Sequence, residues 1–239
     1  MSCGNIHLEF YGLPGCGKTT ISALVAKHIE ISGHIVKCAS AETGSEVNPL
    51  IRRVIKLRRT ISYYFRHRKN CKAIKEIVRQ NGYVGKRESV KQYVNVVQKL
   101  YYYSDDKNDC VFIWDEGLTQ ASVSLSVKGA IPARNNEENL LHYCSDRTQQ
   151  IKIYIKEDIE TVIERMAKRK SNDSRVEKIH DTDEKISLLS RFKKECDTIE
   201  PQIVIEGKGK TPVAISEEIC SALKRMNLFE RIVEREIVG

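Results

Sequence analysis

A run of glycines followed by a lysine and two threonines is the part of this sequence best suited to chemistry. The run is Gly12-Leu13-Pro14-Gly15-Cys16-Gly17-Lys18-Thr19-Thr20, which fits the pattern G-x-x-x-x-G-K-[ST] without a gap. Glycines let successive backbone N–H groups turn toward one anion, and a helix that begins there adds its positive end. Lys18 then supplies a mobile charge for β- and γ-phosphates, and the Thr19 hydroxyl can bind Mg²⁺.

The segments on either side give this loop the context that it needs. Ile6–Tyr11 has the composition of a short strand, and the apolar residues of 18–31 recur at helical spacing before Gly33. A strand, a glycine loop and a helix in that order predict a nucleotide-binding loop over residues 12–20. The alternative is a glycine-rich turn that holds no ligand.

A second candidate site follows a continuous apolar run. Val111–Trp114 is typical of a strand buried on both faces, and it ends in Asp115 and Glu116. A carboxylate at the carboxyl end of such a strand can share the Mg²⁺ that Thr19 meets, so we predict Thr19 and Asp115 as metal-binding residues.

Composition limits the class of protein. The chain has 239 residues, of which 41% are hydrophobic and 30% charged, enough for one large domain or two small ones. It has no run of 18 apolar residues, and its N-terminus lacks the features of a signal peptide. The eight cysteines are scattered without a C-x-x-C pair, which favours reduced thiols over a zinc site. These features predict a cytoplasmic protein without a transmembrane segment.

The net charge of +8 is concentrated in one segment. Residues 51–80 contain eleven Lys or Arg and a single acid, Glu76. We favour a solvated cationic face that steers an anionic substrate. Binding of nucleic acid through these bases and their aromatic neighbours stays open, as does a membrane-surface helix.

The remaining elements predict an α/β fold with a parallel sheet of about five strands and helices on both faces. Leu50, Val54, Leu57, Ile61 and Tyr64 alternate at spacings of four and three, with arginines on the other faces of the helix. We expect a single domain over 1–239, with a helical insertion at about 45–105 beside the acceptor. Further strands are predicted at 35–39, 150–155 and 203–205, and helices at 49–80, 86–103, 158–169, 181–198 and 213–226.

The chain resembles the P-loop nucleoside and nucleotide kinases, most closely the thymidylate kinase-like group. Besides the loop at 12–20, the stretch from Lys168-Arg169 to Asp173-Ser174-Arg175-Val176-Glu177 looks like the lid of these kinases. The resemblance implies a three-layer P-loop NTPase fold, a lid at about 165–180, and ATP and Mg²⁺ as cofactors. It also implies that Arg169 and Arg175 close on the transferred phosphate, and Arg165 could join them.

The sequence departs from the group on the acceptor side. Glu116 stands where thymidylate kinases usually have an arginine, and Glu42 is kept between Ala41 and Thr43 in place of Arg-Glu-Pro. Glu42 could accept a proton from a hydroxyl, or it could cap a helix. We therefore predict a kinase whose acceptor is small and either anionic or a hydroxyl compound, a nucleoside or nucleotide.

Two other functions remain open. Glu116, directly after the Mg²⁺ acid, could orient a water in a P-loop ATPase or NTP hydrolase. A polynucleotide kinase could use residues 51–80 to bind its acceptor. A homodimer is also left open, and residues 227–239 receive no role.

Overall fold

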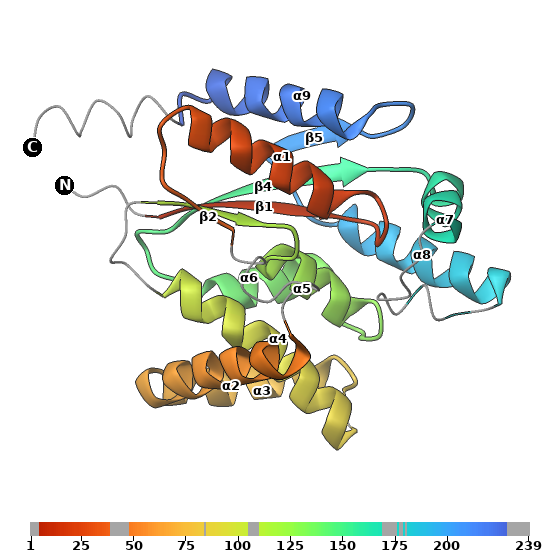
Figure 1. Cartoon of the computed structure of the whole chain (residues 1–239). Coiled ribbons are helices and arrows are strands. Elements are labelled where there is room, and N and C mark those ends of the chain that lie inside the picture. Colours follow the sequence, from red (N-terminus) through yellow and green to blue (C-terminus); the bar gives the residue numbers. More distant parts are fainter. Residues whose placement is uncertain are drawn as a thin grey trace, which may run out of the picture.

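The computed structural model contains one sheet of five strands in the order β2-β3-β1-β4-β5 (Figure 1). Every neighbouring pair is parallel, as predicted. The structure describes residues 5–38, 48–83, 85–104, 110–168, 176, 179 and 181–228. The strands are β1 (Ile6–Gly12), β2 (Val36–Cys38), β3 (Val111–Trp114), β4 (Gln149–Lys156) and β5 (Ile203–Glu206).

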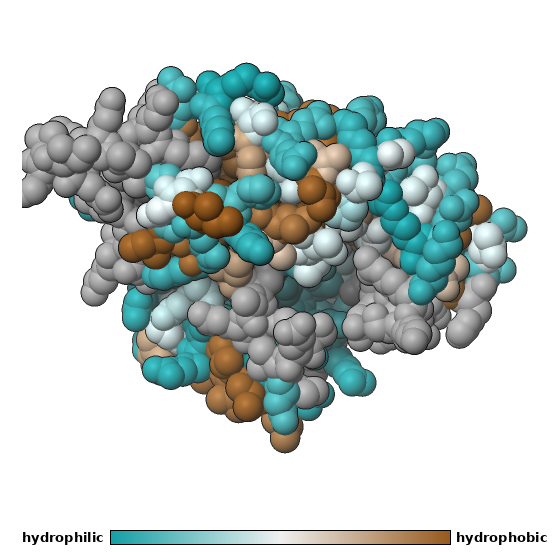
Figure 2. Space-filling view, turned by 45° about the horizontal axis from the view of Figure 1, so that its top comes forward, coloured by the Kyte–Doolittle hydropathy of each residue, from teal (hydrophilic) through white to brown (hydrophobic). Residues whose placement is uncertain are grey.

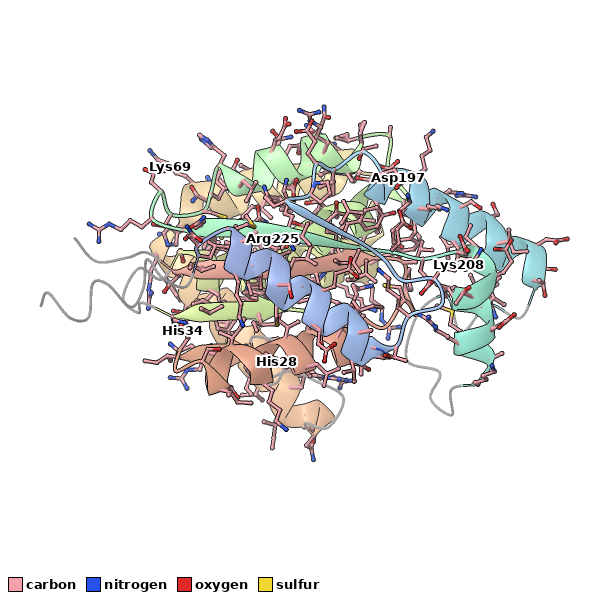
Figure 3. All side chains as sticks on the ribbon, turned by 90° about the horizontal axis from the view of Figure 1, so that it is seen from above. His28, His34, Lys69, Asp197, Lys208 and Arg225 are labelled. Atoms are coloured by element: carbon pink, nitrogen blue, oxygen red, sulfur yellow. The ribbon has the colours of Figure 1, made fainter. Side chains whose placement is uncertain are left out.

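Helices cover both faces of this sheet. α1 (Lys18–Ile31) and α9 (Pro212–Arg225) lie side by side on one face, which is clear from above (Figure 3). The other face is covered by α4 (Lys86–Tyr103), α5 (Leu118–Ser126) and α8 (Thr182–Cys196), with α6 (Ala133–Leu141) against α5 (Figure 1). α7 (Ile159–Ala167) packs on α8. The predicted three-layer α/β fold is confirmed.

The helical region before β3 differs from its prediction in one respect. In place of one helix over 49–80, the chain forms α2 (Pro49–Arg66) and α3 (Arg68–Gln80). His67 separates them with φ −131° and ψ 50°, and its ring stacks on Tyr63 at 4.5 Å between centroids. Both helices on either side of this break pack on α4.

α2 presents its apolar residues to solvent. The stripe of Leu50, Val54, Leu57, Ile61 and Tyr64 has the helical spacing read from the sequence, but these side chains are 44–67% exposed. A stripe of this kind ordinarily faces a core. Here the opposite face of α2 is turned inward and packs on α4, and this face is largely polar.

α5 and α6 were not predicted from the sequence. α5 is buried on nearly every side, so its sequence lacks the alternation of an amphipathic helix. Its buried hydroxyls stay satisfied within the helix, since Ser122 donates to the Leu118 carbonyl and Ser126 to the Ser122 carbonyl. Burial of the whole helix explains why a polar, serine-rich stretch gave no periodic pattern.

An ionisable side chain is buried beneath the centre of the sheet. Glu9 of β1 is fully buried between the sheet and the α4–α5 layer. Its carboxylate accepts hydrogen bonds from the Tyr103 hydroxyl, from the Thr119 backbone N–H at 2.7 Å and from Gln150 Nε2 at 2.7 Å. A Cβ at Gly117 would collide with this carboxylate, so glycine is needed where α5 begins.

We predict that Glu9 makes stability depend on pH. Burial raises the pKa of Glu9 from its ordinary value of 4.5 to about 7, so between these pH values the folded protein holds a proton that the unfolded chain has released. The free energy of unfolding should therefore fall as pH rises from about 4.5 to about 7. Glu9→Gln should remove about 3 kcal/mol of this dependence.

Urea unfolding at about pH 5 and about pH 7.5 measures this effect. Glu217→Gln, at an exposed position of α9, is the matched control, and its free energy of unfolding should depend on pH as that of the wild type does. If the free energy of unfolding of Glu9→Gln changes with pH as much as that of the wild type, Glu9 is not the group that causes the pH dependence.

Candidate active site

The glycine loop has the backbone that its sequence predicts. β1 ends at Gly12 and α1 begins at Lys18. Gly12, Gly15 and Gly17 have φ values of +146°, +89° and +95°, a region that side chains with a Cβ rarely adopt. A Cβ at Gly12 would also collide with the Ile155 carbonyl of β4. The loop therefore depends on glycine both for its turn and for its close approach to the sheet.

Lys18 lies inside this loop. Its side chain is largely buried, and its ammonium donates to the Gly12 carbonyl at 3.0 Å and to the Leu13 carbonyl at 2.9 Å. Both partners are neutral oxygens of the loop itself. A phosphate that entered the loop would offer the ammonium a stronger, charged acceptor.

Thr19 and Asp115 meet at the carboxyl edge of the sheet. The Thr19 hydroxyl donates to Asp115 Oδ2 at 2.8 Å, although the two residues are 96 positions apart. The parallel pairing of β1 with β3 brings the end of each strand to the same edge. A hydroxyl and a carboxylate are hard oxygen ligands, so the pair fits Mg²⁺, which takes its other ligands from water and phosphate.

Gln120 lies at this site although no motif of the sequence indicated it. Gln120, in the first turn of α5, is 6% exposed, and its Oε1 accepts a hydrogen bond from the Gly12 N–H at 3.1 Å. It thereby links the start of the loop to the helix layer. Because α5 was not predicted, no sequence pattern placed Gln120 near the loop.

α7 supports the loop from the other side. Arg165 forms an ion pair with the buried Glu157 at 2.7 Å and donates to the Cys16 carbonyl at 3.5 Å. A Cβ at Gly15 would come within 2.9 Å of Met166 Cε, so α7 and the loop are in tight contact. Arg165, considered as a partner of the lid arginines, therefore touches the loop directly.

Lysines gather near the exposed Glu116. Lys99 of α4 is 5% exposed, and its ammonium donates to Asn95 Oδ1 at 2.9 Å. Burial lowers the pKa of Lys99, while the negative charge of Glu116 opposes the shift. Burial also lowers the pKa of Lys56 on α2, where Arg52 adds to the shift and Glu116 again opposes it. The ammonium groups of Lys56 and Lys99 therefore both lie near enough to the Glu116 carboxylate to be affected by its charge.

Three predicted residues lie outside the described residues: Glu42, Arg169 and Arg175. The chain is described up to Lys168, just past the end of α7, and again at Val176. Val176, the neighbour of Arg175, is 1% exposed and belongs to the main hydrophobic core.

Comparison with known proteins identifies the fold. No protein-family model matches the chain, and no curated protein matches it. A deoxyadenosine kinase from M. mycoides, solved with the products dCMP and a flexible dCDP, has a TM-score of 0.53 and 18% identity. The match covers 92% of this chain and 99% of that one.

The same kinase solved with dATP gives a TM-score of 0.51 at 18% identity over 91% of this chain and 98% of that one. Shikimate kinase from Acinetobacter baumannii in complex with shikimate gives 0.48 at 15% identity, covering 95% and 96%. The chain has the fold of the P-loop kinases. A closer relation to the thymidylate kinase-like group stays a prediction.

Asp115→Asn should weaken the coupling between Mg²⁺ and nucleotide binding. The amide keeps the size of the side chain but removes the negative charge that faces the Thr19 hydroxyl. We expect the gain in ATP affinity on adding Mg²⁺ to fall by about tenfold or more. Titration calorimetry with and without Mg²⁺ measures this gain.

Asp146→Asn, at an exposed position between α6 and β4, is the control. If Mg²⁺ raises the ATP affinity of Asp115→Asn as much as that of the wild type, Asp115 does not bind the metal.

Proposed function

We propose that this protein is a phosphotransferase that uses ATP and Mg²⁺ to phosphorylate a small acceptor, a nucleoside or nucleotide. The observation that carries the proposal is the Thr19–Asp115 hydrogen bond beside the loop that encloses Lys18. These groups stand together at the end of β1, where P-loop proteins hold a triphosphate. The likeness in fold to a deoxyadenosine kinase supports the same reading.

Residues of the loop would hold the nucleotide. Backbone N–H groups of the loop at 12–20, other than that of Gly12, would bind the phosphates, and Lys18 would exchange its carbonyl partners for phosphate oxygens. Thr19 and Asp115 would hold Mg²⁺, which neutralises charge on the triphosphate when bound. Arg169 and Arg175 would contact the transferred group, while Arg165 keeps its position against the loop.

The cations around Glu116 favour an acceptor that carries negative charge. Lys99 is a buried ammonium with three donor hydrogens, and among the described residues it donates a hydrogen bond to Asn95. Lys56 lies nearby on α2. In the reaction an acceptor oxygen forms a bond to the γ-phosphorus as the bond to the ADP oxygen breaks. An acceptor phosphate has no proton to lose, whereas a hydroxyl would pass its proton to a base such as Glu42.

The fate of the γ-phosphate distinguishes transfer from hydrolysis. Labelled ATP should be incubated with nucleosides, nucleoside monophosphates, sugars and short oligonucleotides. We expect the label to appear in a nucleoside or its monophosphate. Label found only as free phosphate, at a rate that acceptors do not change, would favour a hydrolase that uses Glu116 to orient water.

Lys18→Ala should abolish turnover, with a loss of at least about a hundredfold in kcat, because a charge that stabilises the phosphates is removed. Lys27→Ala changes an exposed lysine of the same helix and should leave kcat unchanged. Steady-state rates with the labelled acceptor measure both. Wild-type activity in Lys18→Ala would refute the site.

Lys99→Met should weaken binding of the acceptor and leave binding of the nucleotide unchanged. The change keeps the length of the side chain and removes its charge, so we expect the acceptor KM to rise about 10- to 100-fold. The affinity for ATP without acceptor should not change. Lys224→Met, at an exposed position of α9, is the control. An equal loss of ATP affinity in Lys99→Met would place Lys99 outside the acceptor site.

A further inference from the structure

The exposed apolar face of α2 is unusual for a helix packed on a globular body. Leu50, Val54, Leu57, Ile61, Tyr64 and Phe65 are 44–67% exposed. At 100° per residue they cover an arc of about 100° that runs the length of the helix. Figure 2 shows apolar side chains at the lower end of the molecule, where α2, α3 and α4 lie in Figure 1. An apolar patch of this extent on a soluble surface marks an interaction site.

Arginines border this stripe on both sides. Arg53 and Arg58, both exposed, fall about 20° beyond its two edges. α2 contains six bases and no acid. α3 continues the positive charge with exposed Arg68, Lys69 and Lys72, and Figure 3 shows Lys69 extending away from the body. The surface that surrounds the stripe is therefore strongly cationic.

A cationic cavity extends from the edge of the stripe, at Arg58, toward α4 and the sheet. It has a volume of about 530 Å³, and its described lining contains four cations and no carboxylate. Arg58 lies at the edge of the stripe, Arg59 and Arg66 come from the opposite side of α2, over Tyr102 and Tyr101 of α4, and Lys37 comes from β2. The Arg59 guanidinium lies 4.7 Å from the centroid of the Tyr102 ring, and Lys37 Nζ lies 5.5 Å from that of Phe112. Such a cavity suits a phosphate group.

We propose that α2 docks this protein on an anionic phospholipid surface. The apolar stripe would enter the boundary between headgroups and acyl chains, and the arginines with the adjacent cavity would bind headgroup phosphates. An apolar face bordered by arginines and ending in aromatic side chains is typical of helices that lie in this interface. The proposal does not depend on the catalysed reaction.

The charge around the stripe and the width of the stripe argue against a second copy of this chain and against a partner helix. In a dimer formed by the stripe, Arg53 and Arg58 would flank the seam and face the same arginines of a second copy. An acidic partner helix would satisfy the charge. However, the stripe spans an arc of about 100°, which is wider than the seam of a and d positions through which two helices pack in a coiled coil. The adjacent cavity, with its four cations, has no role in such a helix pair.

Vesicle co-sedimentation tests the proposal. The whole chain should bind vesicles of phosphatidylcholine with about one third phosphatidylglycerol, and bind pure phosphatidylcholine at least about tenfold more weakly. The double variant Leu57→Gln/Ile61→Gln should lose about tenfold or more in binding to anionic vesicles, because apolar surface no longer enters the lipid. Arg58→Gln/Arg66→Gln should lose about tenfold on anionic vesicles and nothing on neutral ones.

The control is Ile31→Gln/Val213→Gln, which changes exposed apolar residues of α1 and α9. It should bind as the wild type does, and circular dichroism should show all variants folded. No binding of the wild type to anionic vesicles would overturn the proposal. Equal binding by Leu57→Gln/Ile61→Gln would overturn it as well. Light scattering that shows a dimer dissociated by that variant would assign the stripe to a second copy of the chain.

Discussion

The parallel pairing of β1 with β3 is the constraint on which the candidate active site depends. Because the two strands run in the same direction side by side, the loop after β1 and the carboxylate after β3 reach one edge of the sheet. The Thr19–Asp115 hydrogen bond is the direct result. The other supports, Gln120 from α5 and Arg165 from α7, then fix the loop from both sides.

The parts of the fold that follow local rules could be predicted from the sequence. The glycine loop is one, because its φ values require glycine at fixed positions. Strands such as Val111–Trp114 are another, since burial on both faces leaves an unbroken apolar run. Where tertiary packing decides, the sequence said less. The helices on either side of His67 both pack on α4, and α5 is buried all round, so periodicity marks neither the break nor α5.

α2 shows the limit of periodicity most clearly. The spacing of its apolar residues predicts a helix but not the direction in which the helix turns them. The side that faces the body carries Lys56 and Arg59, beside the lysine of α4 that stands near Glu116. Because these two cations face the body, the apolar side of α2 is turned to solvent. Glu9 is a similar case, because a single acid within an apolar strand gives no sign of the donors that will surround it.

The position of Lys18 has a consequence for the order of events in a catalytic cycle. Its ammonium already has two backbone acceptors, so a weakly charged ion gains little by displacing them. A triphosphate gains more binding free energy, because it also accepts hydrogen bonds from N–H groups of the loop. Once the γ-phosphate has left with the acceptor, the same two carbonyls compete for the lysine again. The loop carbonyls thus compete with the phosphates of ADP for Lys18, and in the proposed reaction this competition favours release of ADP.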